Sequence, residues 1–77
     1  MAAIQLIPVG ILRQYVGGQE ALDLEGWAGR LVRDLLADLA IPSPLVGGVL
    51  VDGILVQKDY RLRDGDKVKL IPLLGGG

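Results

Sequence analysis

One amphipathic helix between short strand-like segments is the feature that most constrains the fold. Apolar residues recur at three- and four-residue steps and form one stripe on a helix: Ala28, Leu31, Val32, Leu35, Leu36 and Leu39. Pro42 and Pro44 prevent this helix from continuing past about Ala40. The chain has 77 residues, which is room for one domain only. The helix must therefore bury its stripe against whatever flanks it in sequence.

Short apolar runs on both sides of the helix predict strands: residues 4–7, 22–25, 49–51, 54–56 and 67–71. Pro8 and Pro72 cannot donate a ladder hydrogen bond, so we expect the first and last strands to end there. Asp52-Gly53 is a tight-turn signal between two of the strands. Residues 10–18, which close with two glycines, are predicted to be a connection.

This order of elements predicts an α+β fold, a mixed four- to five-stranded sheet packed on one α-helix. If the first and last strands lie side by side, they are parallel neighbours joined across the helix, which is the ubiquitin-like β-grasp arrangement. The first strand of that fold is central, so Pro8 is tolerable only at the strand's end. We predict a single β-grasp domain over residues 1–72 and a flexible Gly-rich tail over residues 73–77.

Composition excludes several functions. Cysteine and histidine are both absent, so the chain has no disulfide, no thiol nucleophile and no imidazole base, and we expect no metal site. Eight basic and nine acidic residues, without a basic run, argue against nucleic-acid binding. No apolar stretch approaches the ~20 residues that span a bilayer, and no signal peptide is recognisable. The expected location is the cytoplasm, away from membranes.

Three glycines end the sequence. They have no side chains to pack, and they offer a thin backbone that finishes in a carboxylate. A narrow enzyme tunnel can accept such a tail where any Cβ would clash, which indicates a substrate handle. The alternative is an ordinary flexible end or a remnant of cloning.

Residues 64–77 combine Asp-Gly-Asp, an alternating strand, Ile-Pro, two leucines and three glycines without a gap. This order resembles the end of the MoaD/ThiS family of ubiquitin-like sulfur carriers, which typically closes with Asp-Gly-Asp, a strand, an aromatic residue or Ile, Pro, Pro, Val, a small residue and Gly-Gly. Gly75 takes the place of the small residue, and residues 76–77 take that of the diglycine. Leu73 and Leu74 replace the second proline and the valine, and both positions stay apolar. Weaker upstream similarities lie in the family's post-strand loop, helix and Val-Asn-Gly turn: residues 12–18, 34–36 and 51–53.

The resemblance implies a protein substrate and not an enzyme. A carboxylate is a poor electrophile, and in this family an activating enzyme related to ubiquitin-activating enzymes adenylates it with ATP and Mg. Sulfur then displaces AMP, which leaves a thiocarboxylate. The position that corresponds to this acceptor is Gly77, and Leu74, Gly75 and Gly76 correspond to the arm that enters the partner's active site.

The resemblance also implies two partners, the ATP-dependent adenylyltransferase and a sulfur-accepting synthase subunit. Family partners dock near the tail on apolar residues, which correspond here to Val9, Leu55 and Ile71; such residues can equally be core or scattered surface. We expect no cofactor on the chain itself. Neither glycine pair, 17–18 or 47–48, is followed by the Gly-Lys-Ser/Thr of a phosphate-binding loop.

Other polar and aromatic residues have structural interpretations. Trp27, at the predicted start of the helix, is expected to fill the core and not to serve as an exposed anchor. Tyr60 and the charges around it are expected in a solvated loop, and Asp64 and Asp66 as turn formers.

The sequence leaves three functions open. The first is a sulfur carrier, the second a protein modifier joined to a target lysine through Gly77, and the third a β-grasp interaction module whose glycines are incidental. Molybdopterin, thiamine thiazole, thiolated tRNA and cysteine pathways all use carriers of this shape, so the pathway also stays open.

Overall fold

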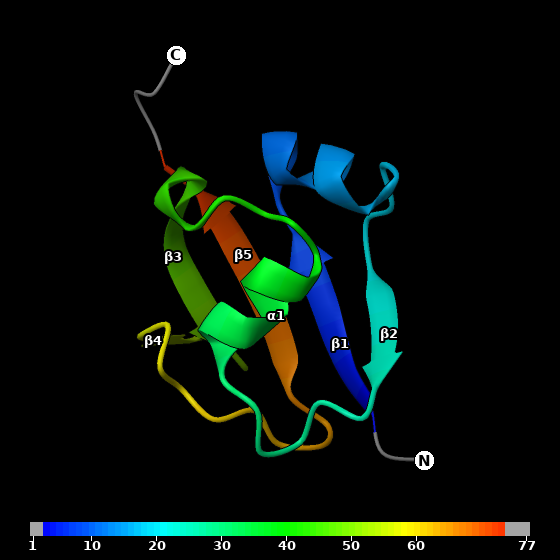
Figure 1. The fold of residues 1–77 in the computed structure, drawn as a ribbon, viewed down its shortest axis with the longest axis vertical. Helices are drawn as coiled ribbons and strands as arrows, with labels where there is room; N and C mark the ends of the chain where they lie inside the picture. Colours follow the sequence, from blue (N-terminus) through cyan, green and yellow to red (C-terminus); the bar gives the residue numbers. More distant parts are fainter. Residues whose placement is uncertain (1–2, 74–77) are drawn as a thin grey trace.

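The computed structural model describes residues 3–73, which form a five-stranded mixed sheet with one α-helix on one face (Figure 1). The strands are β1 Ala3–Pro8, β2 Leu22–Glu25, β3 Val46–Val51, β4 Ile54–Val56 and β5 Lys67–Pro72. The helix α1 spans Val32–Asp38, and two short 3-10 helices, η1 Gly10–Val16 and η2 Ser43–Leu45, lie in the connections. The strand order is β2-β1-β5-β3-β4, with β1 parallel to β5 and the other neighbours antiparallel. The predicted ubiquitin-like β-grasp fold is confirmed.

Pro8 fits this topology because it is the last residue of β1. The pairing of β1 with β2 ends at Leu6 opposite Leu22. Pro8 therefore has no residue of β2 opposite it, and no hydrogen bond to β2 is lost through its missing N–H. On the other side Pro8 lies opposite Leu70 of β5. A proline in a central strand is therefore accommodated at the strand's end, as expected.

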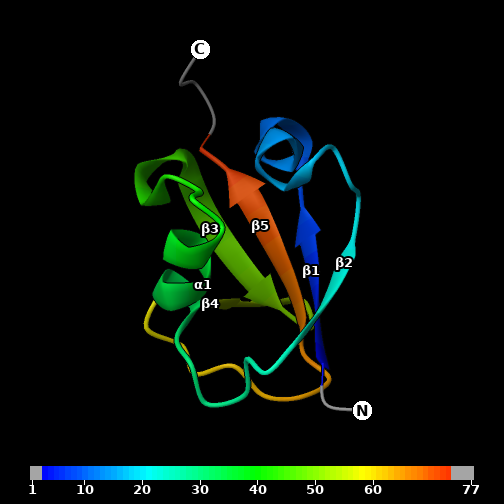
Figure 2. The same ribbon diagram turned by 45° about the vertical axis from the view of Figure 1, so that its right-hand side comes forward.

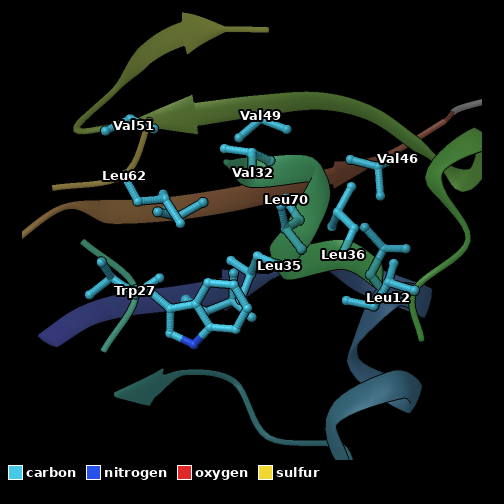
Figure 3. Packing of buried hydrophobic residues seen from close by; sticks show 14 of the residues in the cluster. Leu12, Trp27, Val32, Leu35, Leu36, Val46, Val49, Val51, Leu62 and Leu70 are labelled. Carbon is cyan, nitrogen blue, oxygen red and sulfur yellow. The ribbon is translucent and has the colours of Figure 1, made fainter. Parts of the chain in front are cut away.

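The core lies between α1 and the inner face of the sheet (Figure 3). Val32, Leu35 and Leu36 form the buried side of α1. Aliphatic residues of the alternating strands, of η1 and of the loops complete the cluster, including Ile4, Leu6, Leu12, Val49, Leu62, Val68 and Leu70. The indole of Trp27 is only 7% exposed, which confirms that it fills the core.

The helix begins later than the sequence predicts. Ala28 is exposed, and α1 starts at Val32. Gly29 has a φ of 86°, outside the helical region, and the segment around Leu31 pairs with the loop before β5 through a bridge to Arg61. The first N–H groups of α1 then donate to carbonyl groups of that loop. The N–H of Val32 donates to the carbonyl of Tyr60 at 3.0 Å, and that of Arg33 donates to the carbonyl of Lys58 at 2.9 Å. These tertiary hydrogen bonds take over the role of an N-cap side chain.

The helix ends just before Ala40, as the two prolines indicate. Ala40 has a φ of 57°, and its N–H donates to the carbonyl of Ala37 at 3.1 Å. The N–H of Ile41 donates to the carbonyl of Leu36 at 2.9 Å, which completes a Schellman motif. Ile41 is buried, so the motif also directs the chain back into the core.

Residues 10–16 lie in the predicted connection between β1 and β2, where they form the 3-10 helix η1. Leu12 and Val16 are buried and attach η1 to the core. Gly17, with a φ of 69°, ends it. The apolar pattern of so short a helix covers too few turns to differ from that of a loop.

Tyr60 is more than a residue of a solvated loop. It is half-buried, packs against the core, and its hydroxyl donates to the carboxylate of Asp66 at 2.9 Å. Burial and this hydrogen bond raise the pKa of Tyr60 above 10.0. The same carboxylate oxygen accepts the N–H of Arg63 at 2.9 Å, so Asp66 shapes the turn as predicted and also ties it to Tyr60.

Within residues 3–73, no helix combines the length and the apolar character that crossing a membrane requires.

Candidate functional site

The described chain ends at Leu73, next to the exposed end of the central strand. Figures 1 and 2 show the end of β5 between η1 and η2, with the amino-terminal end of β1 at the opposite end of the sheet. On the η1 side, a Cβ built on Gly10 would lie 3.7 Å from Cγ of Pro72. On the η2 side, the N–H of Leu73 donates to the carbonyl of Leu45 at 2.8 Å. The end of β5 thus lies between η1 and η2, and a hydrogen bond holds it on the η2 side.

A β-bulge shapes the η2 side. Gly48 lies opposite Ile71, but the next pair is Val46 with Pro72, so Gly47 is the extra residue on β3. Proline offers no N–H to β3, and a bulge is one of the places where a sheet tolerates it. Beyond the bulge, the hydrogen bond from Leu73 to Leu45 restores the contact between the two segments.

An apolar groove of about 400 Å³ opens on the outer face of the sheet beside this point. Its floor is the Gly47-Gly48 pair, and its walls include Leu50, Leu55, Ile71 and Leu73. A Cβ on Gly48 would lie 3.7 Å from Cδ1 of Leu55 and 3.8 Å from Cβ of Ile71, so the two walls face each other across a bare backbone. Leu55 is 70% exposed and Leu73 57% exposed, although both are apolar. We call this surface the tail groove.

The structure brings the three predicted docking residues to the same end of the outer face. Leu55 and Ile71 line the tail groove. Val9 is half-buried and donates its N–H to Leu70 at 3.0 Å, which places it beside Ile71 on the η1 side of β5. Val9 lies outside the groove lining, so its part in docking rests on proximity alone.

Lysines flank the tail groove toward the other end of the sheet. Leu50 lies opposite Lys69, and both line a second hollow of about 420 Å³ that also contains Ile7, Asp52 and Lys67. Lys67 and Lys69 are exposed. The outer face therefore offers apolar contact near Leu73 and positive charge farther from it.

Leu74, Gly75, Gly76 and Gly77 lie outside the described residues. Their assignment as the arm and the sulfur acceptor stays a prediction, and so does the docking role of the residues above. Sequence reasoning missed Gly47 and Leu73 as parts of the site. The available signal was a glycine pair inside an apolar strand, a pattern that indicates a bulge or a close backbone approach.

A β-grasp sheet with an apolar groove beside the end of its last strand defines a ubiquitin-like protein, and solved structures agree. Urm1 from Trypanosoma brucei is 26% identical, with 99% of this chain and 96% of that one covered and a TM-score of 0.75. SAMP1 from Haloferax volcanii is 20% identical, with 97% and 99% covered and a TM-score of 0.71. A candidate molybdopterin converting factor subunit 1 from Pyrococcus furiosus is 22% identical, with 94% and 98% covered and a TM-score of 0.69.

The sequence model of the ThiS family matches residues 9–77, which include the final glycines. The chain belongs to the ThiS family, and the resemblance drawn from the sequence is confirmed. Members of this family are small carrier proteins and not enzymes themselves, and they act with activating and sulfur-transfer partners. The search of curated proteins gave no match. Family and fold together establish a ubiquitin-like sulfur carrier or modifier.

Proposed function

We propose that this chain carries sulfur as a thiocarboxylate on Gly77 and delivers it in cofactor biosynthesis of the molybdopterin or thiamine type. The observation that carries the proposal is the family match, which runs through the final glycines. The tail groove supports it, because an apolar surface beside Leu73 lets a partner bind the domain and reach the tail at the same time.

The proposed chemistry needs a partner because the carboxylate has no leaving group. An adenylyltransferase of the ubiquitin-activating type binds ATP and Mg. The Gly77 carboxylate attacks the α-phosphorus of ATP and releases pyrophosphate. A sulfur nucleophile at the oxidation level of sulfide then attacks the acyl carbon, and AMP leaves with the C–O bond electrons. The chain contributes a carboxylate on a slender backbone and a surface that holds the enzyme close.

The direct test is the intact mass of the chain after incubation with the adenylyltransferase of the same organism, ATP, Mg and sulfide. The expected gain is the mass difference between one sulfur and one oxygen atom, and the gain should disappear when ATP is omitted. An unchanged mass under conditions in which the enzyme forms acyl-adenylate on this chain would contradict the carrier.

Docking on the tail groove predicts a specific loss of affinity. Leu55→Asp places a charge where the partner must remove water, and we expect binding to the adenylyltransferase to weaken by about 2 kcal/mol, roughly thirtyfold. Titration calorimetry with the purified pair measures the change.

Ile54→Asp is the matched control. Ile54 adjoins Leu55 on β4 and is 69% exposed against 70%, but it lies opposite Val51, on the other face of the strand. Its variant should bind as the wild type does. Equal losses in both variants would show that charge on β4, and not the groove, governs affinity.

A protein modifier is the second candidate, supported by the structural similarity to a protein named small archaeal modifier protein 1 from Methanosarcina acetivorans, with 21% identity and a TM-score of 0.70. In that function the activated Gly77 carbonyl is attacked by a lysine amine of a target. Immunoblots of cell extract against the domain separate the two functions. A ladder of larger adducts that depends on Gly77 favours the modifier, and a single band favours the carrier.

A further inference from the structure

We propose that Gly47 is a positioning residue, whose missing side chain seats Leu73 against β3 and so fixes where the tail leaves the tail groove. The inference rests on the proposed function, because it concerns delivery of the Gly77 carboxylate to the activating enzyme.

The first observation is the close approach of Leu73 to Gly47. A Cβ built on Gly47 would lie 3.0 Å from Cα of Leu73, 3.2 Å from its Cδ1 and 3.3 Å from its backbone nitrogen. These separations are shorter than ordinary van der Waals contact between carbon atoms. Two of the three atoms belong to the backbone, so a single Cβ at this position requires the chain of Leu73 to move by a few tenths of an ångström, and a larger side chain requires more.

The second observation is that, within residues 3–73, the backbone φ gives no reason for a glycine at position 47. Among the glycines that the structure describes, seven have positive φ and Gly47 is not one of them: Gly10, Gly17, Gly18, Gly26, Gly29, Gly53 and Gly65. Its φ is not in the left-handed region that favours glycine, and glycine inside a strand is unfavourable compared with a β-branched residue. The space occupied by Leu73 is therefore the physical reason for the glycine.

The third observation is that the seat and the tail groove share residues. Leu73 is a wall of the groove, Gly47 is part of its floor, and the N–H of Leu73 is fixed to Leu45 at 2.8 Å. An enzyme bound in the groove therefore meets the start of the tail at one defined place. Four residues separate this fixed point from the reacting carboxylate at Gly77. A shift of the seat moves that carboxylate relative to the enzyme, and misplacement by about 1 Å can reduce a rate a hundredfold.

The functional test uses Gly47→Ala and Gly47→Val and measures acyl-adenylate formation with the same adenylyltransferase. The KM for the carrier should change less than the kcat, because the walls formed by Leu50, Leu55 and Ile71 stay in place and only Leu73 shifts. The kcat should fall by about twofold to threefold for alanine, whose Cβ needs only a small shift, and by about ten- to a hundredfold for the larger valine. A purely structural role would raise KM or unfold the domain and would not produce this split. Wild-type kcat in Gly47→Val would overturn the inference.

A second measurement tests the seat without the enzyme. The amide proton of Leu73 should be protected from hydrogen exchange in the wild type and lose protection in Gly47→Val. Gly48→Ala is the control for this measurement, because its Cβ would make only ordinary contacts at 3.7 Å or more. Its Leu73 amide should stay protected. An unprotected Leu73 amide in the wild type would contradict the proposed seating of Leu73 against β3, and this result does not depend on whether the chain carries sulfur. A wild-type chain that no activating enzyme adenylates would overturn the carrier and leave the seat testable.

Discussion

Adding one alanine after Gly77 is expected to abolish thiocarboxylate formation, with the rate of adenylation reduced by more than about a hundredfold. One residue extends the backbone by roughly 3.3 to 3.6 Å, which moves the carboxylate well beyond the reach of the α-phosphorus of bound ATP. The tail groove and the seat of Leu73 stay intact, so the extended chain should still bind the enzyme. Intact mass and pyrophosphate release measure the two steps.

Two variants separate length from width in this test. Gly76→Ala keeps the length of the tail and adds a single Cβ. A loss of activity in this variant therefore indicates that the enzyme's channel is too narrow for a side chain, and not that the tail must have one length. An alanine inserted after Met1 adds the same residue at the other end of the chain and should leave adenylation unchanged. Thiocarboxylate formation at the wild-type rate in the extended chain would falsify the proposed acceptor.

Truncation of Leu35 to alanine is expected to remove a large part of the stability of the domain. Leu35 has no exposed surface and lies at the centre of the buried side of α1 (Figure 3). Leucine-to-alanine changes at such positions reduce the free energy of unfolding by about 2 to 5 kcal/mol. A domain of this length has only about 4 to 12 kcal/mol in total. Urea denaturation followed by circular dichroism measures the loss.

Arg33→Ala is the control on the same helix. Arg33 is exposed, and the hydrogen bond that it makes at the start of α1 uses its backbone N–H, which the substitution keeps. Its free energy of unfolding should change by less than about 0.5 kcal/mol. A similar midpoint for Leu35→Ala and Arg33→Ala would show that the core does not depend on the α1 stripe.

Four of the five strands could be predicted from the sequence to within a residue at each end because each carries a complete local signal. In contrast, β3 begins at Val46, three residues before its predicted range, because Gly47 and Gly48 interrupt its apolar pattern. β2 matches its predicted range, and the Asp52-Gly53 turn between β3 and β4 has both residues at positive φ, 50° and 83°, as that dipeptide indicates. The two prolines at strand ends were equally informative. Period-two burial in β1 and β5 follows directly from the alternating side chains of a strand.

The elements that sequence reasoning missed depend on contacts with distant residues. The start of α1 is set by carbonyl groups of Lys58 and Tyr60, which lie far along the chain. No pattern in the sequence around the helix predicts these hydrogen bonds. The hydrogen bond between the Tyr60 hydroxyl and Asp66 also cannot be predicted from the sequence, because it depends on the conformation of the turn between them. At the site, the docking residues came from family resemblance. The role of Gly47 required the position of Leu73.

The parallel pairing of β1 with β5 has a consequence for synthesis on the ribosome. Gln5 of the first strand lies opposite Lys67 of the last, and β5 is the middle strand of the sheet. A nascent chain that has reached only β4 has two separate hairpins and no strand to join them, because β5 is the partner of both β1 and β3. The same strand supplies Ile71, a wall of the tail groove. An unfinished chain therefore has neither a continuous sheet nor a complete tail groove, so under the proposed function only completed molecules would compete for the activating enzyme.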